Sequence, residues 1–532
     1  MANATPPAPP ANARQDPRTT ADIVRAHGAA RGDAPAITFE GATLTWGDLD
    51  RRTSQVANGL AALGVGSQDR IAFIDKNGPE YFEVFFGAGK INAVTVAVNW
   101  RLAPGEMAYI INHAEAKVLF VGPEFLPHLE KIEGDLTTVK HTIVLGDDAS
   151  RPTYEAWVGE QAADDPAVAS AGDDVCFQLY TSGTTGLPKG VMLTNDNLFA
   201  MLPNVAEMWG VGPDDVNLVA MPLFHIGGSG WAVAGMLRGG HAILLREVDP
   251  AQILQVLPQH SVTHAFLVPA VLQFLLMMPG VQDADFSSLR LIAYGAAPIT
   301  DQVLKDCLAT FGCDFVQLYG LTETTGAITQ LDPSDHDPVN RPELLRSCGK
   351  PFPWVEMRVV DEATGEDRPE GEVGELWSRT SQNMKGYWRQ PDETAKTITP
   401  DGWLKTGDAG YFKDGYVYLH DRVKDMIVSG GENIYPAEIE NALMNHPAVA
   451  DVAVIGVPSD KWGETVKAIV VRAEGADPTP EELIAFSREH LAHYKCPTSV
   501  DFADELPRNP SGKLLKRELR APYWQGKERM VN

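Results

Sequence analysis

Residues 175–190 read VCFQLYTSGTTGLPKG and carry the strongest local signal in the sequence. The apolar run up to position 180 predicts a buried strand. The Gly, Ser and Thr residues after it form a loop that offers backbone N–H groups and hydroxyls to phosphate oxygens, with Lys189 as a cation. The loop is not a Walker A motif, because Pro188 and Lys189 stand where that motif requires Gly-Lys. The segment therefore predicts a phosphate-binding loop of another kind, placed directly after a strand.

The composition indicates an ordinary globular enzyme. The chain has 532 residues, of which 44% are hydrophobic and 22% are charged, and a domain of roughly 150 residues is typical. Two to four domains are therefore expected. The formal charge of −27, from 44 Lys+Arg and 71 Asp+Glu, argues against a nucleic-acid binder, which needs an excess of basic residues on one face. A local nucleotide site remains compatible with this charge.

The cysteines and the chain termini indicate the compartment. Five scattered cysteines, an odd number, do not suggest a disulfide framework, so a reducing compartment is expected. Residues 1–17 are rich in Pro and Ala and are predicted to be a disordered tail, not a signal peptide. The most apolar stretch, residues 265–278, is too short to span a bilayer. We expect a cytoplasmic protein with at most peripheral membrane contact, and a homodimer stays open.

Strand-like and helix-like segments alternate along most of the chain. Thr45 and Asp48 have the spacing of a capping box at the start of a helix. The expected elements that follow are a helix to residue 63, a strand at 70–74, a helix from 80 to 87 and a strand at 94–98. Such alternation is typical of parallel sheets covered by helices.

A boundary is expected late in the chain. A charged segment, residues 421–425, follows a strand at 417–419. After it come an expected helix at 436–444, strands at 449–457 and 464–471, and a helix at 480–491. We therefore predict an α/β protein with a large N-terminal domain (18–422) of parallel-sheet subdomains covered by helices. A small α+β C-terminal domain (423–532) should follow a hinge near Lys424.

Six further motifs occur in order along the chain. They are FHIGG at 224–228, YGAAP at 294–298, YGLTE at 319–323, WLKTGD at 403–408, DRVKD at 421–425 with SGGE at 429–432, and PRNPSGK at 507–513. Together with residues 175–190 they resemble the adenylate-forming superfamily, which contains acyl-CoA synthetases, luciferases and the adenylation domains of peptide synthetases. The resemblance covers roughly residues 22–520 and implies a mobile C-terminal domain that serves two half-reactions.

The resemblance implies that a carboxylate and ATP give an acyl-adenylate and pyrophosphate, after which a thiol takes the acyl group. Two anions must meet in the first step, so catalysis should consist mostly of charge neutralisation and alignment. Lys513 is implied to bridge the carboxylate and the α-phosphate, and Glu323 to hold Mg²⁺. Thr184 is implied to donate to phosphate oxygens, and His225 to lie at the carboxylate end of the acyl pocket.

The same resemblance implies a set of binding residues for ATP and for CoA as co-substrate. The implied phosphate contacts are Thr181, Ser182, Gly183, Thr185, Gly186, Lys189 and Thr322. The implied adenine side consists of Gly295, Ala296, Ala297, Pro298, Tyr319 and Gly320. Asp408 is implied to accept hydrogen bonds from both ribose hydroxyls. Arg422 is implied to hold the ribose or a phosphate, and Lys424 to act as the hinge. Ser429, Gly430, Gly431 and Trp462 are implied to line the channel for the thiol arm of CoA.

Within the superfamily, this sequence resembles the acyl-CoA synthetase branch most closely. The residues that carry this resemblance are 430–438 and Phe224-His225. The segment 224–235 has no carboxylate for a substrate amine, which argues against an adenylation domain of a peptide synthetase. Residues 226–233 carry no charge at all, so an apolar acyl tail is expected. The favoured substrate is a medium- or long-chain fatty acid. An aryl or alicyclic acid, an acyl-AMP ligase that loads a carrier protein, and a nucleotide-sensing module without catalysis stay open. The presence of both Glu323 and Lys513 argues against the last.

Overall fold

The computed structural model describes residues 17–148, 150–181, 187–297, 299–361, 364–422, 425–429, 432–434, 436–459, 462–491, 493–508 and 514–525. The chain divides into two compact units. The first contains Met1–Leu345, Pro351–Glu356 and Arg379–Leu404, and the second contains Arg346–Lys350, Met357–Ser378 and Lys405–Asn532. This division follows the density of contacts, so the boundary at 422/423 and the hinge at Lys424, which lies outside the described residues, stay predictions.

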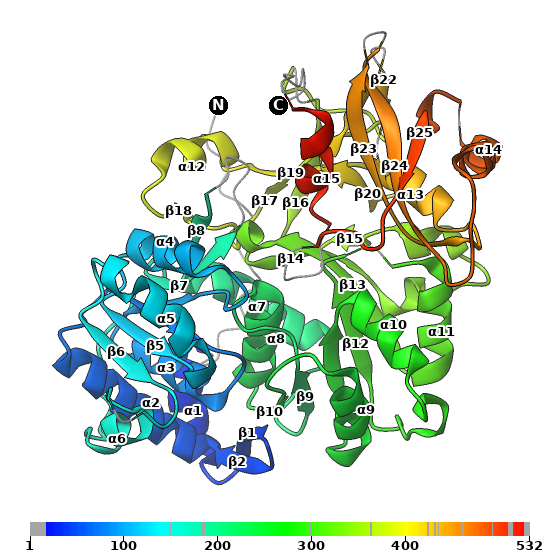
Figure 1. Ribbon diagram of the computed structural model, residues 1–532. Coiled ribbons are helices and arrows are strands. Elements are labelled where there is room, and N and C mark those ends of the chain that lie inside the picture. Colours follow the sequence, from blue (N-terminus) through cyan, green and yellow to red (C-terminus); the bar gives the residue numbers. More distant parts are fainter. Residues whose placement is uncertain are drawn as a thin grey trace. The chain divides into compact units, whose positions relative to one another are not determined.

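A nine-stranded sheet forms one half of the first unit (Figure 1). Its strands are β1 (Pro35–Phe39), β2 (Ala42–Thr45), β9 (Val216–Val219), β10 (His241–Leu244), β11 (His264–Leu267), β12 (Leu291–Gly295), β13 (Asp314–Leu321), β14 (Gly326–Leu331) and β15 (Lys350–Pro351). Their order is β15-β14-β13-β12-β11-β9-β10-β1-β2. The inner pairs are parallel, whereas β14 and β2 run antiparallel to β13 and β1.

A seven-stranded sheet forms the other half. Its strands are β3 (Arg70–Ile74), β4 (Val94–Ala97), β5 (Val118–Val121), β6 (His141–Val144), β7 (Val175–Thr181), β8 (Lys189–Thr194) and β18 (Gly386–Tyr387). The order is β18-β8-β7-β4-β3-β5-β6, with β8 antiparallel to both β7 and β18. Every residue of β3, β4 and β5 is buried, as expected for parallel strands with both faces covered.

Helices cover these sheets. For example, α3 packs beside β4, and α8 packs beside β9 (Figure 1). The helices of the first unit are α1 (Thr20–Arg31), α2 (Trp46–Ala62), α3 (Pro79–Lys90), α4 (Pro104–Ala114), α5 (Leu126–Ile132), α6 (Tyr154–Gly159), α7 (Asn195–Met208), α8 (Ile226–Leu237), α9 (Pro250–Gln259), α10 (Pro269–Met277), α11 (Asp301–Phe311) and α12 (Pro391–Thr397). The capping box predicted from Thr45 and Asp48 is present at the start of α2. The predicted α/β class is confirmed.

The second unit contains two smaller sheets. The first has the order β16-β17-β19-β20, and the second the order β22-β21-β24-β23 with β25 beside β24. The strands are β16 (Glu356–Val360), β17 (Gly374–Arg379), β19 (Leu404–Lys413), β20 (Tyr416–Arg422), β21 (Ile427–Ser429), β22 (Glu432–Ile434), β23 (Val449–Ser459), β24 (Gly463–Arg472) and β25 (Ser499–Phe502). The helices are α13 (Pro436–Leu443), α14 (Pro480–His490) and α15 (Lys516–Arg520).

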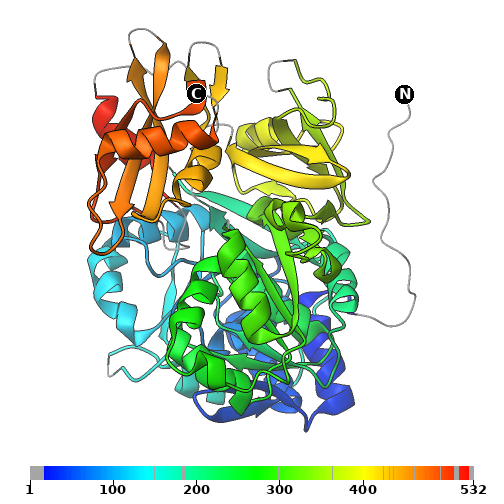
Figure 2. The same cartoon turned by 90° about the vertical axis from the view of Figure 1, so that its right-hand side faces the viewer.

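The last sheet buries both of its faces. Val452 and Val454 of β23 pack with Leu483 of α14, which Figure 2 shows in front of the strands. The alternate residues, Ala453 and Ile455, pack in a second cluster toward the end of the chain. This two-residue alternation is what a strand between two layers requires. The helices and strands expected between residues 436 and 491 are therefore confirmed as an α+β arrangement.

Among the described helices, none combines the length and the apolar character that crossing a membrane requires. The apolar stretch at 265–278 falls mainly in β11 and α10. The five cysteines are free thiols.

Candidate active site

Two of the motifs meet at the end of β7. Thr181 ends β7, and its hydroxyl donates to Oε1 of Glu323 at 3.3 Å. Glu323 lies in a short 3₁₀ helix, Thr322–Thr324, that follows β13 directly. The loop residues Ser182, Gly183, Thr184, Thr185 and Gly186 lie outside the described residues. The structure thus brings a hydroxyl at the start of the predicted phosphate loop to the predicted metal ligand.

The phenol of Tyr387 is a second partner of Glu323 and was not among the predicted site residues. Its hydroxyl donates to Oε1 of Glu323 at 2.9 Å. Burial and the negative charge of Glu323 raise the pKa of Tyr387, so the phenol stays protonated and remains a donor. β18, which carries Tyr387, pairs with Val191 and Met192 of β8. A contact between positions so distant in sequence leaves no local signal that could have predicted it.

Trp388 anchors the strand that carries Tyr387. The Arg70 guanidinium carbon lies 3.6 Å from the centre of the Trp388 ring, and the indole N–H donates to the carbonyl of His113 at 2.9 Å. The Trp388 N–H donates to the carbonyl of Gly190 at 2.7 Å. These contacts fix β18 to the edge of the seven-stranded sheet, and so they fix the direction of the Tyr387 phenol.

Lys189 is buried and forms an ion pair with Glu393, in the first turn of α12. Hydrogen bonds from Lys189 and from Lys396 lower the pKa of Glu393 to about 2. The Lys189 ammonium also lies 5.0 Å from the centre of the Tyr387 ring. The predicted phosphate-binding lysine therefore has a carboxylate partner, Glu393, that the sequence analysis did not identify.

The expected adenine side lies at the ends of β12 and β13, which are parallel neighbours. A Cβ atom on Gly295 would lie 2.2 Å from the carbonyl oxygen of Leu318, and one on Gly320 would lie 1.9 Å from that of Gly326. Neither position tolerates a side chain. Ala296 has a φ of 66°, in the left-handed region. Tyr319 is buried in β13.

The other predicted residues of this side have fewer described features. Ala297 is half-buried, and Pro298 lies outside the described residues. Thr322 starts the 3₁₀ helix, and its carbonyl accepts from the N–H of Thr325. The predicted residues thus lie at the carboxyl ends of β12 and β13, which is also where Glu323 lies.

His225 is the N-cap residue of α8, at the end of the loop that follows β9, and its side chain makes no capping hydrogen bond. Its Nε2 atom is buried and has no hydrogen-bond partner among the described residues. Burial, and to a smaller extent the charge of Arg101, lowers the pKa of His225 to about 4. The imidazole is therefore neutral at pH 7, and its unpaired nitrogen is available to a ligand.

The second unit carries the remaining predicted residues. Asp408 of β19 and Arg422 of β20 are directly opposite partners in the antiparallel ladder. The Asp408 N–H donates to the hydroxyl of Thr406, and Gly407, with a φ of 70°, donates its N–H to Glu375. The predicted ribose carboxylate therefore stands on a tightly bonded strand segment.

The predicted thiol channel is described only in part. Ser429 pairs with Glu432 and Gly463 in the five-stranded sheet, and Trp462 is 49% exposed. Lys424, Gly430, Gly431 and Lys513 lie outside the described residues. The roles of all the site residues stay predictions.

The residues around Glu323 fit a magnesium ion. Mg²⁺ needs only one or two carboxylates when phosphate oxygens supply other ligands. Both hydrogen bonds to the Glu323 carboxylate reach Oε1, and among the described residues Oε2 accepts none. No group of three or more His, Cys, Asp or Glu able to hold a metal occurs in the described part of the chain. A metal here would thus be shared with phosphates.

Comparison with known proteins defines the class. Residues 24–388 match the AMP-binding enzyme family, and residues 438–513 match the C-terminal domain of AMP-binding enzymes. The chain is 41% identical over 506 residues to the fatty acid–[acyl-carrier-protein] ligase ScoC of Streptomyces coeruleorubidus, covering 94% of this chain and 95% of that one. It is 40% identical over 493 residues to a feruloyl-CoA synthase of Amycolatopsis, covering 92% and 96%.

A solved structure agrees with these relatives. A fatty acyl CoA synthetase of Mycobacterium tuberculosis is similar with a TM-score of 0.77 and 32% identity, covering 96% of this chain and 99% of that one. The chain belongs to the AMP-binding, adenylate-forming enzyme family. It is an AMP-forming acid–thiol ligase whose substrates are a small carboxylic acid, ATP and a thiol of the CoA type.

Proposed function

We propose that this ligase activates a medium- or long-chain fatty acid and passes the acyl group to CoA. The observation that carries the proposal is the half-buried His225 ring, whose Nε2 atom is buried and unpaired among the described residues, at the start of the uncharged helix α8. A carboxylate bound at the imidazole would have its tail beside an apolar helix, as small-molecule sites generally require. The fatty-acid names of two of the relatives agree with this substrate.

The chemistry consists of two displacements. A carboxylate oxygen attacks the α-phosphorus of ATP, and the bond to the bridging oxygen breaks, so that pyrophosphate leaves. The thiol sulfur then attacks the acyl carbonyl, and the bond from that carbon to the AMP oxygen breaks. We assign Lys513 to neutralise the meeting anions and Thr184 to donate to a phosphate oxygen. Glu323 would hold Mg²⁺, which supplies positive charge to the phosphates when bound.

The remaining site assignments follow the motifs. Lys189, Thr181 and Thr322 would face the phosphates, and Lys189 would exchange Glu393 for a phosphate when ATP binds. Tyr319 and the Gly295–Pro298 loop would hold adenine, and Asp408 with Arg422 would hold the ribose. The remaining assigned loop residues are Ser182, Gly183, Thr185, Gly186 and Gly320. Rotation about Lys424 would then bring Ser429, Gly430, Gly431 and Trp462 to the thiol arm of CoA.

A carrier protein is the second candidate for the thiol acceptor. The relative with 41% identity over nearly the whole chain is a ligase for an acyl carrier protein. Both acceptors present a phosphopantetheine thiol, so the same channel would serve either. An aryl acid is the second candidate for the carboxylic acid substrate, because one relative is a feruloyl-CoA synthase.

The cellular setting is part of the same proposal. We place the enzyme in the cytoplasm, where ATP and CoA are available and free thiols such as its five cysteines persist. Membrane contact would be peripheral at most. A homodimer is the assembly to be tested, by sedimentation of the purified chain.

Acid-dependent pyrophosphate release tests the proposal. Straight-chain acids from acetate to stearate, benzoate, cyclohexanecarboxylate and ferulate are compared, each with CoA, with a phosphopantetheinylated carrier protein, or with neither. Turnover with a fatty acid that CoA stimulates is the expected result. Stimulation by the carrier protein alone would transfer the assignment to the second candidate. No acid-dependent release with any substrate would overturn the proposal.

A further inference from the structure

A buried glutamine side chain holds the turn that carries Glu323. Gln382 lies between β17 and β18, is fully buried, and belongs to none of the motifs. Its Nε2 atom donates to the carbonyl oxygens of Thr324 and Ala327 at 2.9 and 2.6 Å. These two carbonyls flank the bend between the 3₁₀ helix of Glu323 and β14. A single amide group therefore spans the turn.

The orientation of this amide is fixed at both ends. The indole N–H of Trp354 donates to Oε1 of Gln382 at 2.8 Å. A flipped amide would present its N–H groups to the indole N–H and its oxygen to the two carbonyls, so only the observed orientation satisfies all of these groups. Because the side chain is buried and engaged at both ends, it supports the turn and does not itself contact a substrate.

The main chain around Gln382 is bonded to the same turn. The Thr325 hydroxyl donates to the carbonyl of Gln382, and the Met384 N–H donates to the carbonyl of Glu323 at 2.8 Å. Asn197, in the first turn of α7, donates through Nδ2 to the carbonyls on either side of Gln382 at 2.9 and 2.8 Å. This segment therefore joins the Glu323 turn to α7.

The backbone of the turn requires such support. Thr325 has a φ of 57°, a left-handed conformation that is unusual for a β-branched residue. Backbone of this kind persists only where the surrounding structure holds it. Thr324 and Thr325 are completely buried, so water cannot replace a hydrogen bond that is lost there. Without the Gln382 amide, the carbonyls of Thr324 and Ala327 would each lose a donor, and the turn would relax.

We infer that Gln382 is a positioning residue for Glu323, because it fixes the main chain of the turn before the nucleotide and Mg²⁺ bind. Tyr387 holds Oε1 of the same carboxylate, so one segment fixes both the main chain and the side chain of Glu323. Partners that orient a metal ligand in this way commonly change metal affinity by about tenfold to a hundredfold. The inference rests on the proposed function, since it takes Glu323 as the metal ligand.

Calorimetric binding without turnover tests the inference. α,β-Methylene-ATP is titrated into the wild-type chain and its variants, once with Mg²⁺ and once with EDTA. The metal gain is the Kd in EDTA divided by the Kd with Mg²⁺. Gln382→Met keeps the length of the side chain and removes the amide, so it should lower the metal gain by about tenfold. The Kd for AMP, measured in EDTA, should stay unchanged, because AMP lacks the phosphates that would share the metal.

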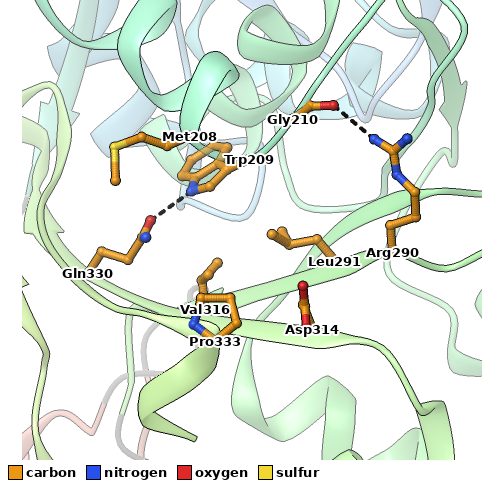
Figure 3. A pocket seen from close by; sticks show the side chains of 9 residues that line it. All are labelled: Met208, Trp209, Gly210, Arg290, Leu291, Asp314, Val316, Gln330 and Pro333. Carbon is orange, nitrogen blue, oxygen red and sulfur yellow. Dashed lines mark hydrogen bonds between the residues drawn. The ribbon is translucent and has the colours of Figure 1, made fainter.

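A matched control is Gln330→Met. Gln330 is also a buried glutamine, and its Oε1 accepts from the indole N–H of Trp209 at 2.7 Å, as Figure 3 shows. It lines a pocket together with Leu291 and Asp314, which are the first residues of β12 and β13. A strand advances about 3.4 Å per residue, so Gln330 lies about 14 Å along β14 from the turn. This variant loses a comparable indole acceptor and should keep the wild-type metal gain.

The comparison between the two glutamines decides the inference. An unchanged metal gain in Gln382→Met, an equal loss in Gln330→Met, or a matching loss of AMP affinity in Gln382→Met would overturn it. Should Gln382→Met fail to fold, Gln382→Glu takes its place, because it keeps an acceptor for Trp354. The negative charge that it adds would attract a cation, so a lowered metal gain would still report the lost donor, and an unchanged or higher one would overturn the inference.

Glu323→Gln separates this inference from the proposed function. It removes the charge of the proposed metal ligand and should lower the metal gain whatever the role of Gln382. A wild type whose nucleotide affinity does not respond to Mg²⁺, or a full metal gain in Glu323→Gln, would contradict the metal assignment of the proposed function itself. A loss in Glu323→Gln without a loss in Gln382→Met would overturn the positioning role alone.

Discussion

The hydrogen bond from Tyr387 to Glu323 shows how a single side chain can direct a ligand. An ionised carboxylate has two oxygens, and the phenol occupies one of them at 2.9 Å. The other oxygen accepts no hydrogen bond from the described residues, so it is the one open to a ligand. We therefore treat Tyr387 as a positioning residue for the proposed metal ligand.

Tyr387→Phe removes this donor but keeps the ring. Loss of a hydrogen bond to a charged group costs about 1.5–3 kcal/mol, so adenylation should fall by at least about tenfold. The Mg²⁺ concentration for half-maximal pyrophosphate exchange should rise, as it should in Glu323→Gln. Tyr109→Phe, on α4, is the control and should match the wild type. An unchanged Mg²⁺ requirement in Tyr387→Phe would contradict the positioning role.

The loss of solvent around the half-buried His225 makes stability depend on pH. Its pKa is about 4 in the folded chain, below the ordinary 6.5, so the unfolded state binds more protons between these values. The stabilisation is complete above pH 6.5 and is lost as the pH falls toward 4, by at most about 3 kcal/mol. In urea unfolding, His225→Leu should therefore show a shallower loss of stability than the wild type over this window. Parallel pH profiles would show that the imidazole does not titrate as described.

At the scale of elements, β13 and β14 approach so closely that one position admits only glycine. The ladder between them has an irregularity at Tyr319/Gly320, and a Cβ atom on Gly320 would lie 1.9 Å from the carbonyl oxygen of Gly326. Backbone atoms cannot move aside as a flexible side chain can. Gly326 in turn lies near Ile226 of α8, since a Cβ atom on Gly326 would be 3.7 Å from Cγ1 of Ile226.

Gly320→Ala should therefore separate the two strands. Overpacking costs about 1–3 kcal/mol, and the melting temperature and the adenylation rate should both decrease. Gly105→Ala on α4 is the control, because a Cβ atom there has nothing within 4 Å and alanine favours a helix. The control should melt at or above the wild-type temperature. Equal melting temperatures for Gly320→Ala and the wild type would show that the strands are not in this close contact.

Individual helices and strands could be predicted from the sequence because they depend on residues that are close together in the chain. The capping box at Thr45 and the apolar strand at Arg70–Ile74 depend on neighbouring residues, and both are present. The sheet order could not be predicted, since β9 lies between β11 and β10 and parallel crossovers leave such orders open. The motif residues Thr181 and Glu323 were expected and do meet. Tyr387 and Glu393 were missed because their partners are far away in sequence.

At the scale of the whole molecule, one chain is proposed to perform two half-reactions with different residues. Lys513→Ala should lower adenylation by about a hundredfold to a thousandfold, as removal of a group that acts mainly in the transition state does. Thioester formation from preformed acyl-AMP should be largely retained. Lys424→Pro should show the reverse pattern, because proline fixes the backbone at the proposed hinge. Equal loss of both half-reactions in Lys513→Ala would contradict the division of labour.

The most direct test of the account follows an oxygen atom. The purified ligase is incubated with ATP, CoA and a fatty acid whose carboxylate carries oxygen-18. The masses of the products are then measured by mass spectrometry. If the carboxylate attacks the α-phosphorus and the thiol then displaces AMP, one labelled oxygen appears in AMP and the pyrophosphate is unlabelled. Label in inorganic phosphate together with formation of ADP, or unlabelled AMP, would contradict the acyl-adenylate route.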